Sequence, residues 1–330
     1  DIDILLEGID SAIFSLGIKN NILFYAGIYP VDDVLVPVNQ MCDRAHMALN
    51  TVKGLYKKRY AYYDEKMRET LLEEQMLLRE MEQALSSGQF CVYYQPIYSI
   101  KAGRAVSAEA LVRWRHPTAG VIPPVRFVPL FERNGFVVRL DRFAWEEVCR
   151  MLAERIRAGL PVVPVSVNVS RLNFYDNDFC DTVVGLLQKY GLDPSLLRLE
   201  ITESAYTDNP VQLLSVLKRL HDIGLTILMD DFGSGYSSLN MLKNVTVDIL
   251  KIDMGFVQNL EDSERAPTIL RRVVEMAHDL KMSVVVEGVE TKAQIDFLSS
   301  IDCDKIQGYY FAKPMAREDF TALIEKEAGR

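Results

Sequence analysis

The chain has 330 residues and a formal net charge of −9 at pH 7, and 49% of its residues are hydrophobic and 25% charged. This is the composition of an ordinary globular protein, long enough for one large domain or two unequal ones. The negative charge excludes a surface for non-specific binding of duplex nucleic acid, which would be basic. No apolar run approaches the roughly 20 residues that span a bilayer. We therefore expect a cytoplasmic protein with no membrane segment in this chain, and any membrane tether would lie in regions outside it.

The cysteines indicate whether the protein forms disulfides, and the first residue bears on whether the sequence is a fragment. The five cysteines are scattered, with no C-x-x-C pair, and are Cys42, Cys91, Cys149, Cys180 and Cys303. This usage is typical of reduced core thiols rather than of a disulfide framework or a zinc site. The chain begins at Asp1 without an initiator methionine, so we expect it to be a fragment of a longer protein.

Residues 1–64 differ in pattern from the rest of the chain. Apolar residues at helical spacing predict a helix over Ile2–Leu16, a strand signal covers Ile22–Tyr29, and a second helix is predicted over Val38–Leu49. This is too little chain for an independent core of much stability. The sequence therefore predicts a small, partial α+β segment.

Residues 65–87 form a charged stretch without Gly or Pro until Gly88. Its apolar residues recur at steps of three, four and seven, which predicts a connecting helix with one apolar face: Met67, Leu71, Leu78, Met81 and Leu85. Two interpretations remain open. The helix packs on its own domain, or it is a coiled, dimer-forming signalling connector.

From residue 88 to 330, strand and helix patterns alternate. Helical patterns separate most of the strands and cover Arg142–Ala158, Asp178–Tyr190, Pro210–Ile223, Pro267–Leu280 and Lys292–Ile301. Eight strands are predicted: Phe90–Ser99, Ala105–Trp114, Val162–Val169, Leu196–Ile201, Leu225–Asp230, Ile249–Asp253, Ser283–Val286 and Lys305–Phe311. This alternation predicts an α/β fold, a (β/α)₈ TIM-like barrel. The first two strands are joined by only about four residues, a hairpin connection, so one antiparallel pair is expected near the start.

Polar residues close or interrupt the apolar runs of several strands. Glu109, Asn168, Glu200 and Asp230 are predicted at the ends of four strands, and such ends meet at one face of a barrel. Three carboxylates and a carboxamide suit Mg²⁺ or Mn²⁺ rather than zinc. The adjacent Asp231 could hold a second ion, as in two-metal phosphoryl-transfer sites. Any one of them taken singly is better explained as a helix N-cap or as a solvated loop residue. Their recurrence at strand ends favours a metal site.

Charged residues elsewhere allow more than one interpretation. A lone lysine such as Lys251 is usually a snorkelling surface residue, but among so many acids we interpret it as a cation that orients an attacking water. Glu287 and Glu290 follow the next strand. Arg113 could bind a phosphate oxygen or pair with a neighbouring acid, and its spacing does not decide between them. The small-residue loop Asp231–Ser238 lacks the spacing of a phosphate-binding loop, so we expect a mobile lid or a dimer contact.

Ordered sequence blocks carry a resemblance to a known family. Glu109-Ala110-Leu111, followed by Val112-Arg113-Trp114, resembles the signature of EAL-domain cyclic di-GMP phosphodiesterases. The resemblance covers roughly residues 88–328, and its further blocks are Tyr94-Gln95-Pro96-Ile97, Asn168-Val169-Ser170, Glu200-Ile201-Thr202-Glu203, Asp230-Asp231-Phe232-Gly233, Lys251-Ile252-Asp253, Glu287-Gly288-Val289-Glu290 and Gln307-Gly308-Tyr309. The family's barrel has an antiparallel first strand, as the hairpin here predicts.

The resemblance implies roles for individual residues. The metal ligands would be Glu109, Asn168, Glu200, Asp230 and Asp231, holding two Mg²⁺ or Mn²⁺ ions. The catalytic residues would be Lys251, Glu287, Glu109 and Gln307, with Lys251 helping to activate water. Substrate contacts would come from Gln95, Leu111, Arg113, Asp253 and Tyr309. Glu203 would hold the Asp231–Ser238 loop and, with Glu290, couple it to a dimer contact.

The front of the chain resembles the C-terminal half of a GGDEF domain. The blocks concerned are Ala26-Gly27-Ile28-Tyr29, Cys42-Asp43-Arg44-Ala45 and Val52-Lys53-Gly54. The signature Gly-Gly-Asp-Glu-Phe is absent from this chain, so no diguanylate cyclase activity is expected of it. We expect an upstream sensory or GGDEF portion to be missing.

Three functions are compatible with parts of this pattern. The first is metal-dependent hydrolysis of cyclic di-GMP to linear pGpG, with a possible homodimer. The second is a catalytically silent cyclic di-GMP receptor that signals through the connecting helix; such a receptor should lack at least one metal ligand, and here all are present. The third takes the acids as calcium sites for stability, which leaves Lys251 unexplained. The sequence favours the phosphodiesterase.

Overall fold

The computed structural model describes residues 2–15, 22–55, 58–203, 205, 210–233, 242–258, 260 and 265–329. The chain divides into two compact units, Asp1–Glu80 and Met81–Arg330, and the division falls within one long helix. No helix among the described residues is long and apolar enough to cross a membrane.

The first unit is built on a short βαβ arrangement. Strands β1 (Ala26–Ile28) and β2 (Tyr60–Tyr62) are parallel and are connected through helix α2 (Val38–Val52). Helix α1 covers Ile2–Ser15. Helix α2 lies so close to β1 that a Cβ atom on Gly27 would come within 1.8 Å of a backbone oxygen of α2. Both predicted helices are confirmed, whereas β2 was not predicted because its Tyr-Ala-Tyr run is only three residues long.

The core of this unit is small. Ala48 and Val52 of α2 pack on Ala61 of β2, with Tyr25, Tyr63 and Met67 at its edge. The predicted connecting helix is α3, Glu65–Ser86. Its last turn belongs to the second unit, where the Nδ2 of Asn134 lies 3.2 Å from the Sδ of Met81. Three buried aliphatic residues provide little apolar area, as expected for so short a segment.

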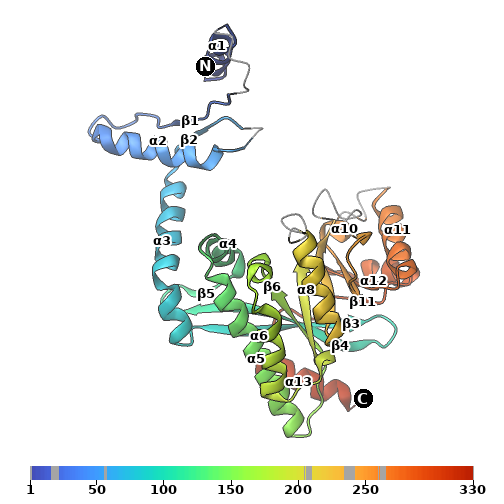
Figure 1. The fold of residues 1–330 in the computed structure, drawn as a ribbon. Helices are drawn as coiled ribbons and strands as arrows, with labels where there is room; N and C mark the ends of the chain where they lie inside the picture. The colour runs from blue at the N-terminus through green and yellow to red at the C-terminus, as the bar shows by residue number, and fades with distance from the viewer. Residues whose placement is uncertain are drawn as a thin grey trace. The chain divides into compact units, whose positions relative to one another are not determined.

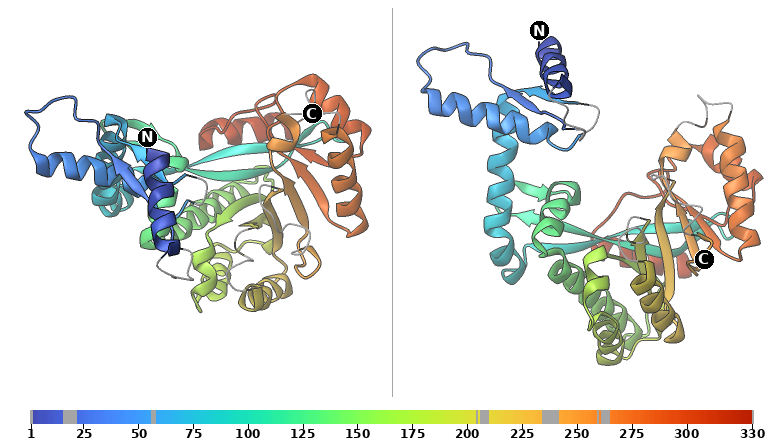
Figure 2. Two further views of the ribbon diagram at one scale, coloured as in Figure 1. Left: turned by 90° about the horizontal axis from the view of Figure 1, so that it is seen from above. Right: turned by 45° about the horizontal axis from the view of Figure 1, so that its top comes forward.

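The second unit is a closed barrel (Figures 1 and 2). Within the described residues, the strand order is β3-β11-β10-β9-β8-β7-β6-β4 and back to β3, with β5 outside on β4. The barrel strands are β3 (Phe90–Ser99), β4 (Arg104–His116), β6 (Val165–Val169), β7 (Leu197–Thr202), β8 (Thr226–Phe232), β9 (Ile249–Ile252), β10 (Ser283–Val286) and β11 (Lys305–Ile306), and β5 is Gly120–Ile122. Only β3 runs antiparallel to its neighbours in the barrel. The predicted barrel and its antiparallel start are confirmed.

Helices surround the barrel (Figure 1). The helices of this unit are α4 (Pro124–Asn134), α5 (Val137–Arg157), α6 (Phe179–Tyr190), α8 (Pro210–Asp222), α10 (Gly255–Gln258), α11 (Ala266–Asp279), α12 (Lys292–Ser300) and α13 (Arg317–Ala328). Every predicted helix is found within a few residues of its expected bounds. Helix α4 was missed because prolines at 123, 124 and 129 argue against a helix. The predicted strand over Lys305–Phe311 is wrong beyond Ile306, where the chain turns.

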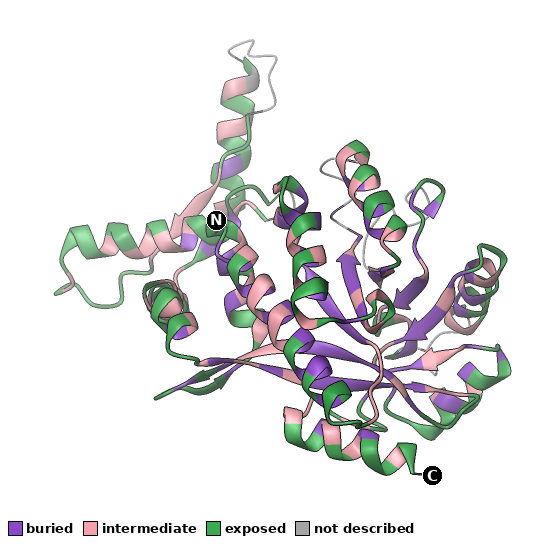
Figure 3. Cartoon of the chain, turned by 60° about the horizontal axis from the view of Figure 1, so that its bottom comes forward, coloured by how far each residue is buried: buried purple, intermediate pink, exposed green. Residues whose placement is uncertain are grey.

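Alternation along the strands separates the core from the barrel interior. On β7, Leu197, Leu199 and Ile201 face the main core, and Arg198 and Glu200 therefore face inward. Figure 3 shows most of the barrel strands as buried and the outer faces of the helices as largely exposed. The interior carries its own apolar layer, formed by Ile97, Leu228, Ile249 and Val285 from four strands. The interior thus has an apolar floor beneath the polar residues of the upper strand ends.

Two expectations about single residues are corrected. Glu109 does not end a strand but lies in the middle of β4, which pairs with the parallel β6 only around Ala108–Ala110 and then continues with β3 and β5 to His116. Glu109 therefore lies where β4 leaves the parallel part of the barrel. The interpretation of all cysteines as core thiols is also wrong, since Cys42 is exposed and Cys91 only partly buried.

Candidate active site

A buried lysine stands at the centre of the candidate site. Lys251 of β9 is 0% exposed, and its Nζ atom lies close to carboxylates from four other strands or strand ends. The distances from Lys251 Nζ are 3.2 Å to Glu109 Oε2, 2.8 Å to Glu200 Oε2, 2.9 Å to Asp230 Oδ1 and 2.8 Å to Glu287 Oε1. An ammonium group carries one charge and three protons. One lysine cannot neutralise four carboxylates.

The pKa values reflect this excess of acid. Burial, with the nearby charge of Glu109, raises the pKa of Glu200 well above its ordinary value. Burial also raises the pKa of Glu287 to about 7 and, together with Asp230, that of Asp231 to about 6. Burial opposes the charge of Lys251, but the surrounding carboxylates raise its pKa well above the ordinary value. The lysine thus stays protonated, and the site needs further positive charge.

Glu109 behaves differently from the other acids. Burial alone would raise its pKa, but Lys251 and the hydrogen bonds from Gln307 and Asn168 hold that pKa below the ordinary value. Asn168 Nδ2 donates to Glu109 Oε1 at 3.2 Å, and Gln307 Nε2 donates to Glu109 Oε2 at 2.7 Å. Gln307 Nε2 also lies 3.1 Å from Gln95 Oε1, which links β11 to β3. Glu109 is therefore the firmly ionised and best-oriented acid of the group.

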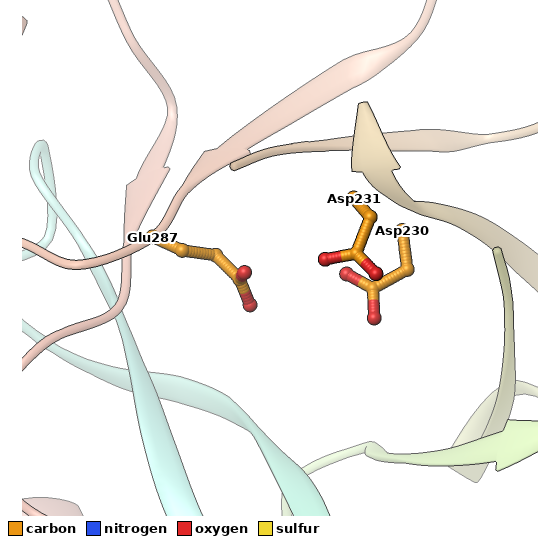
Figure 4. A group of neighbouring side chains, drawn as sticks. All are labelled: Asp230, Asp231 and Glu287. Carbon is orange, nitrogen blue, oxygen red and sulfur yellow. The ribbon is translucent and has the colours of Figure 1, made fainter. Parts of the chain in front are cut away.

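An irregularity in β8 brings two successive acids to the same place. In a regular strand, Asp230 and Asp231 would point to opposite faces. Here the pairing of β8 with β9 shifts register between Met229 and Phe232, and Asp231 adopts a positive φ of 56°. As a result, carboxylate oxygens of Asp230, Asp231 and Glu287 all lie within 4.8 Å of one another, and their side chains converge in Figure 4. Such bulges commonly redirect side chains at active sites.

The donor set fits a divalent cation with a preference for oxygen. Glu200 Oε1 is buried and has no hydrogen-bond partner among the described residues. A buried carboxylate oxygen without a partner costs free energy unless something binds it. The five predicted metal ligands are all brought into this connected group: Glu109, Asn168, Glu200, Asp230 and Asp231. Oxygen ligands of this kind suit Mg²⁺ or Mn²⁺. Glu287, assigned a catalytic role from the sequence, joins the same cluster.

Two cavities flank Glu109. The larger, about 610 Å³, lies between β4, β6, α4 and α5, and the smaller, about 240 Å³, lies beside Glu287 and Gln307. Both are lined by Glu109 and Leu111. The smaller is also lined by three further residues with sequence-predicted roles, Gln95, Tyr309 and Glu290. The site is therefore open on both sides of the acid cluster, with room for an elongated ligand.

The remaining predicted residues lie outside both cavity linings. The guanidinium of Arg113 is half-buried, lies 5.9 Å from the ring centre of Tyr93 and forms no ion pair in the part of the chain described, so the ion-pair interpretation lacks support. Asp253 Oδ1 accepts a hydrogen bond from Gly255 N, the first residue of α10, at 2.8 Å. Glu203 is buried after β7. The Asp231–Ser238 loop that it was predicted to hold lies outside the described residues from position 234 onward.

Gly308, the residue after Gln307, lies directly against the backbone of Val289. A Cβ atom at Gly308 would come within 2.1 Å of the backbone oxygen of Val289 and 2.4 Å of its nitrogen. Backbone atoms cannot move aside cheaply, so we expect Gly308→Ala to destabilise the fold by about 1–3 kcal/mol, the range for overpacking. Urea unfolding measures this change. Gly185→Ala, where nothing lies within 4 Å of the added atom, is the control and should not be destabilised; equal stability of the two variants would contradict the packing argument.

A network that supports Asn168 was not anticipated from the sequence. Asp141 of α5 is buried, and its Oδ2 accepts hydrogen bonds from Ser170 N at 2.9 Å and Asn173 Nδ2 at 2.7 Å. Ser170 Oγ in turn donates to Glu132 Oε1 of α4 at 3.2 Å. These contacts fix the turn that comes after Asn168. Nothing in the sequence pattern indicated it, because Asp141 lies just before the helix predicted over Arg142–Ala158, and only the structure extends that helix back to Val137.

We expect Asp141→Asn to stabilise the protein at alkaline pH. Burial raises the pKa of Asp141 to about 7, above its unfolded value, so the folded state binds the extra proton. The stability of the parent then falls as pH rises from about 4 to 7 and stays level above it. Asparagine keeps one side-chain oxygen that can accept both hydrogen bonds, but it carries no charge. The substitution therefore removes the free-energy cost of ionising the buried Asp141, which is on the order of 2–4 kcal/mol. Urea unfolding of both proteins in EDTA between pH 4.5 and 8 measures the difference. A variant no more stable than the parent at pH 8 would contradict this.

Known proteins are similar to this chain in sequence and in fold. Residues 78–314 match the family model of the EAL domain. The chain belongs to the EAL family. The chain is similar to the cyclic di-GMP phosphodiesterase NbdA of Pseudomonas aeruginosa, with 35% identity over 304 residues, or 91% of this chain and 39% of the relative. The oxygen sensor protein DosP of Escherichia coli is 33% identical over 275 residues, or 83% of this chain and 34% of the relative.

A solved structure is similar in fold to the second unit of this chain. The PaMucR phosphodiesterase in complex with c-di-GMP superposes with a TM-score of 0.71 at 36% sequence identity, covering 74% of this chain and 99% of that one. The chain spans well under half of the length of the two relatives described above. The family assignment therefore concerns the barrel. The resemblance of residues 1–64 to a GGDEF domain stays a prediction.

Proposed function

We propose that this EAL domain hydrolyses one phosphodiester bond of cyclic di-GMP to give linear pGpG. The observation that carries the proposal is the buried Lys251 among four carboxylates, with cavities on both sides of Glu109. A two-sided site of this kind can accept the two nucleotide halves of a cyclic dinucleotide. The proposal is supported by relatives such as NbdA, a cyclic di-GMP phosphodiesterase, and by the c-di-GMP complex of PaMucR.

The proposed enzyme requires two Mg²⁺ or Mn²⁺ ions. Glu109, Asn168, Glu200 and Asp230 would hold one ion, and Asp230 with Asp231 would hold the second. Glu287 lies close enough to share the second site. When bound, such ions supply positive charge that acidifies water and stabilises the phosphoryl oxygens. The uncompensated acids and the unpartnered Glu200 Oε1 support this assignment.

The chain's own residues then have separate tasks. Lys251 keeps its proton, so it acts as a donor that orients the attacking water and not as a base. The Gln307–Gln95 pair holds Glu109 in one orientation, and the Asp141 network holds the turn after Asn168. Gln95, Leu111 and Tyr309 would contact the substrate from the smaller cavity. Arg113 would bind a phosphate, since its charge is free of ion pairs among the described residues. Asp253, whose carboxylate accepts a hydrogen bond from Gly255 N at the start of α10, would contact the substrate.

The alternative, a catalytically silent receptor, is not favoured. A receptor needs no complete set of metal ligands, yet all of the predicted ligands are present here and brought together. A homodimer, the coupling roles of Glu203 and Glu290, signalling through α3, a sensory or GGDEF portion upstream and a cytoplasmic location remain proposals for the whole protein. None of them is needed for hydrolysis at the barrel.

A chromatographic assay with cyclic di-GMP and Mg²⁺ tests the proposal. We expect the parent to form pGpG and Glu109→Ala to form none, since the variant loses the acid that Lys251, Asn168 and Gln307 contact. Glu318→Ala, at an exposed position of α13, is the control and should keep full activity. Binding of cyclic di-GMP without product would favour the receptor. Absence of both binding and product would contradict the proposed substrate.

A further inference from the structure

Helix α5 contacts the backbone of the strand end that carries Asn168. Trp145 of α5 is 1% exposed, and its indole Nε1 donates to the backbone oxygen of Asn168 at 3.0 Å. One turn earlier on the same helix, Asp141 Oδ2 accepts from Ser170 N at 2.9 Å. Residues four apart lie on the same face of a helix. One face of α5 therefore provides a donor just before Val169 and an acceptor just after it.

This support takes the place of a strand neighbour that β6 lacks at its end. Strand β6 pairs with β4 only as far as Val167, because β4 then continues with β3 and β5. Pro164 O accepts from Ala108 N of β4, and carbonyls two residues apart on a strand point to the same neighbour. The carbonyl of Asn168, four residues after Pro164, therefore points to the side where β4 no longer pairs. The indole of Trp145 supplies the donor on that side.

The larger cavity lies on this same side of Asn168. It has a volume of about 610 Å³, lies between β4, β6, α4 and α5, and is lined by both Glu109 and Asn168. On its other side, β6 is paired with β7, where Asn168 lies opposite Glu200. Trp145 is itself held in the core, since its ring centre lies 5.5 Å from that of Phe179. The position of Asn168 is thus set by β7 on one side and by α5 on the other.

We propose that Trp145 is a positioning residue of the metal site, which holds the backbone of Asn168 so that its side chain can bind an ion together with Glu109. The amide of Asn168 already donates from Nδ2 to Glu109 Oε1 at 3.2 Å, and its oxygen is the atom that would bind the ion. The inference rests on the proposed metal-dependent function, but it concerns the affinity for the ion and not the reaction. Groups that orient a metal ligand typically contribute about 10- to 100-fold to metal affinity.

Binding of Mn²⁺, measured by titration calorimetry without substrate, tests this role. Trp145→Phe keeps an aromatic ring in the core and removes the N–H donor, so we expect the Kd of one of the two ions to rise about tenfold or more. Trp114→Phe is the matched control. Trp114, the other tryptophan of the chain, is 0% exposed, donates from Nε1 to Gln89 Oε1 at 2.9 Å and lies outside both cavity linings. This variant loses the same donor elsewhere and should bind Mn²⁺ as the parent does.

A double variant shows whether Trp145 acts through Asn168. In the Asn168→Ala background, Trp145→Phe should raise the Kd for Mn²⁺ no further, because no side chain is left to position. Urea unfolding reports whether each variant folds. Should Trp145→Phe fail to fold, Asp141→Ala removes the other contact between α5 and this strand end and should weaken Mn²⁺ binding in the same way.

The possible results separate this role from the proposed hydrolysis. Unchanged Mn²⁺ affinity in Trp145→Phe, an equal loss in Trp114→Phe, or a further loss in the Asn168→Ala background overturns the inference. A parent that binds no Mn²⁺ overturns it together with the proposed metal site. A parent that binds Mn²⁺ with the expected differences between variants, but forms no pGpG, supports the positioning role and contradicts the proposed hydrolysis.

Discussion

Lys251→Met is expected to abolish hydrolysis, lowering the rate of pGpG formation by about 10³-fold or more, and to destabilise the metal-free protein. Lys251 is fully buried and forms ion pairs with four carboxylates. Removing the one cation leaves these acids facing each other inside the barrel. Breaking a buried ion pair by deleting one partner typically costs about 3–5 kcal/mol. Product chromatography and urea unfolding in EDTA measure the two effects.

The effect of Mg²⁺ separates the structural role of Lys251 from its catalytic role. Divalent ions supply positive charge to the same carboxylates, so Mg²⁺ should recover a large part of the lost stability. Activity should stay lost, because the ions do not replace the donor that orients water. Lys189→Met is the matched control, since its partner Glu146 lies on the surface; an exposed ion pair contributes about 1 kcal/mol at most. Restoration of turnover by Mg²⁺ alone would refute the catalytic role of Lys251.

The fold could be predicted because strand and helix patterns alternate with regular spacing over most of the chain. The antiparallel start could be inferred from the short connection between the first two strands. The acids of the site could be selected because each interrupts an apolar run, and a parallel barrel brings such positions together. Lys251 could be interpreted from its neighbours in the same way. For these features, local pattern and global topology agree, so sequence alone was sufficient.

Other features depend on contacts that local patterns do not reveal. The shift in β8 that turns Asp231 toward Asp230 arises from pairing with β9, and nothing in Met-Asp-Asp-Phe predicts its position. β4 continues past Glu109 because β3 and β5 supply partners for it. Asp141 and Arg198 look like ordinary surface residues of a helix and a strand. Only the closed barrel and its helices show that they are enclosed.

The second large effect is expected for Glu200→Gln, which should make the metal-free protein more stable while abolishing activity. Burial raises the pKa of Glu200 well above its ordinary value, so the folded state binds a proton that the unfolded state releases. Stability attributable to this group therefore falls as pH rises through the unfolded pKa toward the folded one. Glutamine removes that loss. It can still accept from Lys251, and its amide can donate among the neighbouring carboxylates.

The same change removes a metal ligand, so the response to Mg²⁺ should reverse the order of stability. In EDTA at pH 8, the melting temperature of Glu200→Gln should exceed that of the parent by several degrees, and the difference should vanish near pH 4. With Mg²⁺, the parent should gain stability by binding the ions, and the variant should gain little.

Removing one ligand should lower the rate of hydrolysis by about 10³-fold, as for a lost electrostatic contact in a transition state. Glu147→Gln, a partly exposed position of α5 that pairs with Arg150 and is outside the candidate site, should change neither quantity. A variant that is less stable than the parent in EDTA would contradict this prediction. It would mean that the contacts of Glu200 with Lys251 stabilise the fold by more than its buried charge destabilises it.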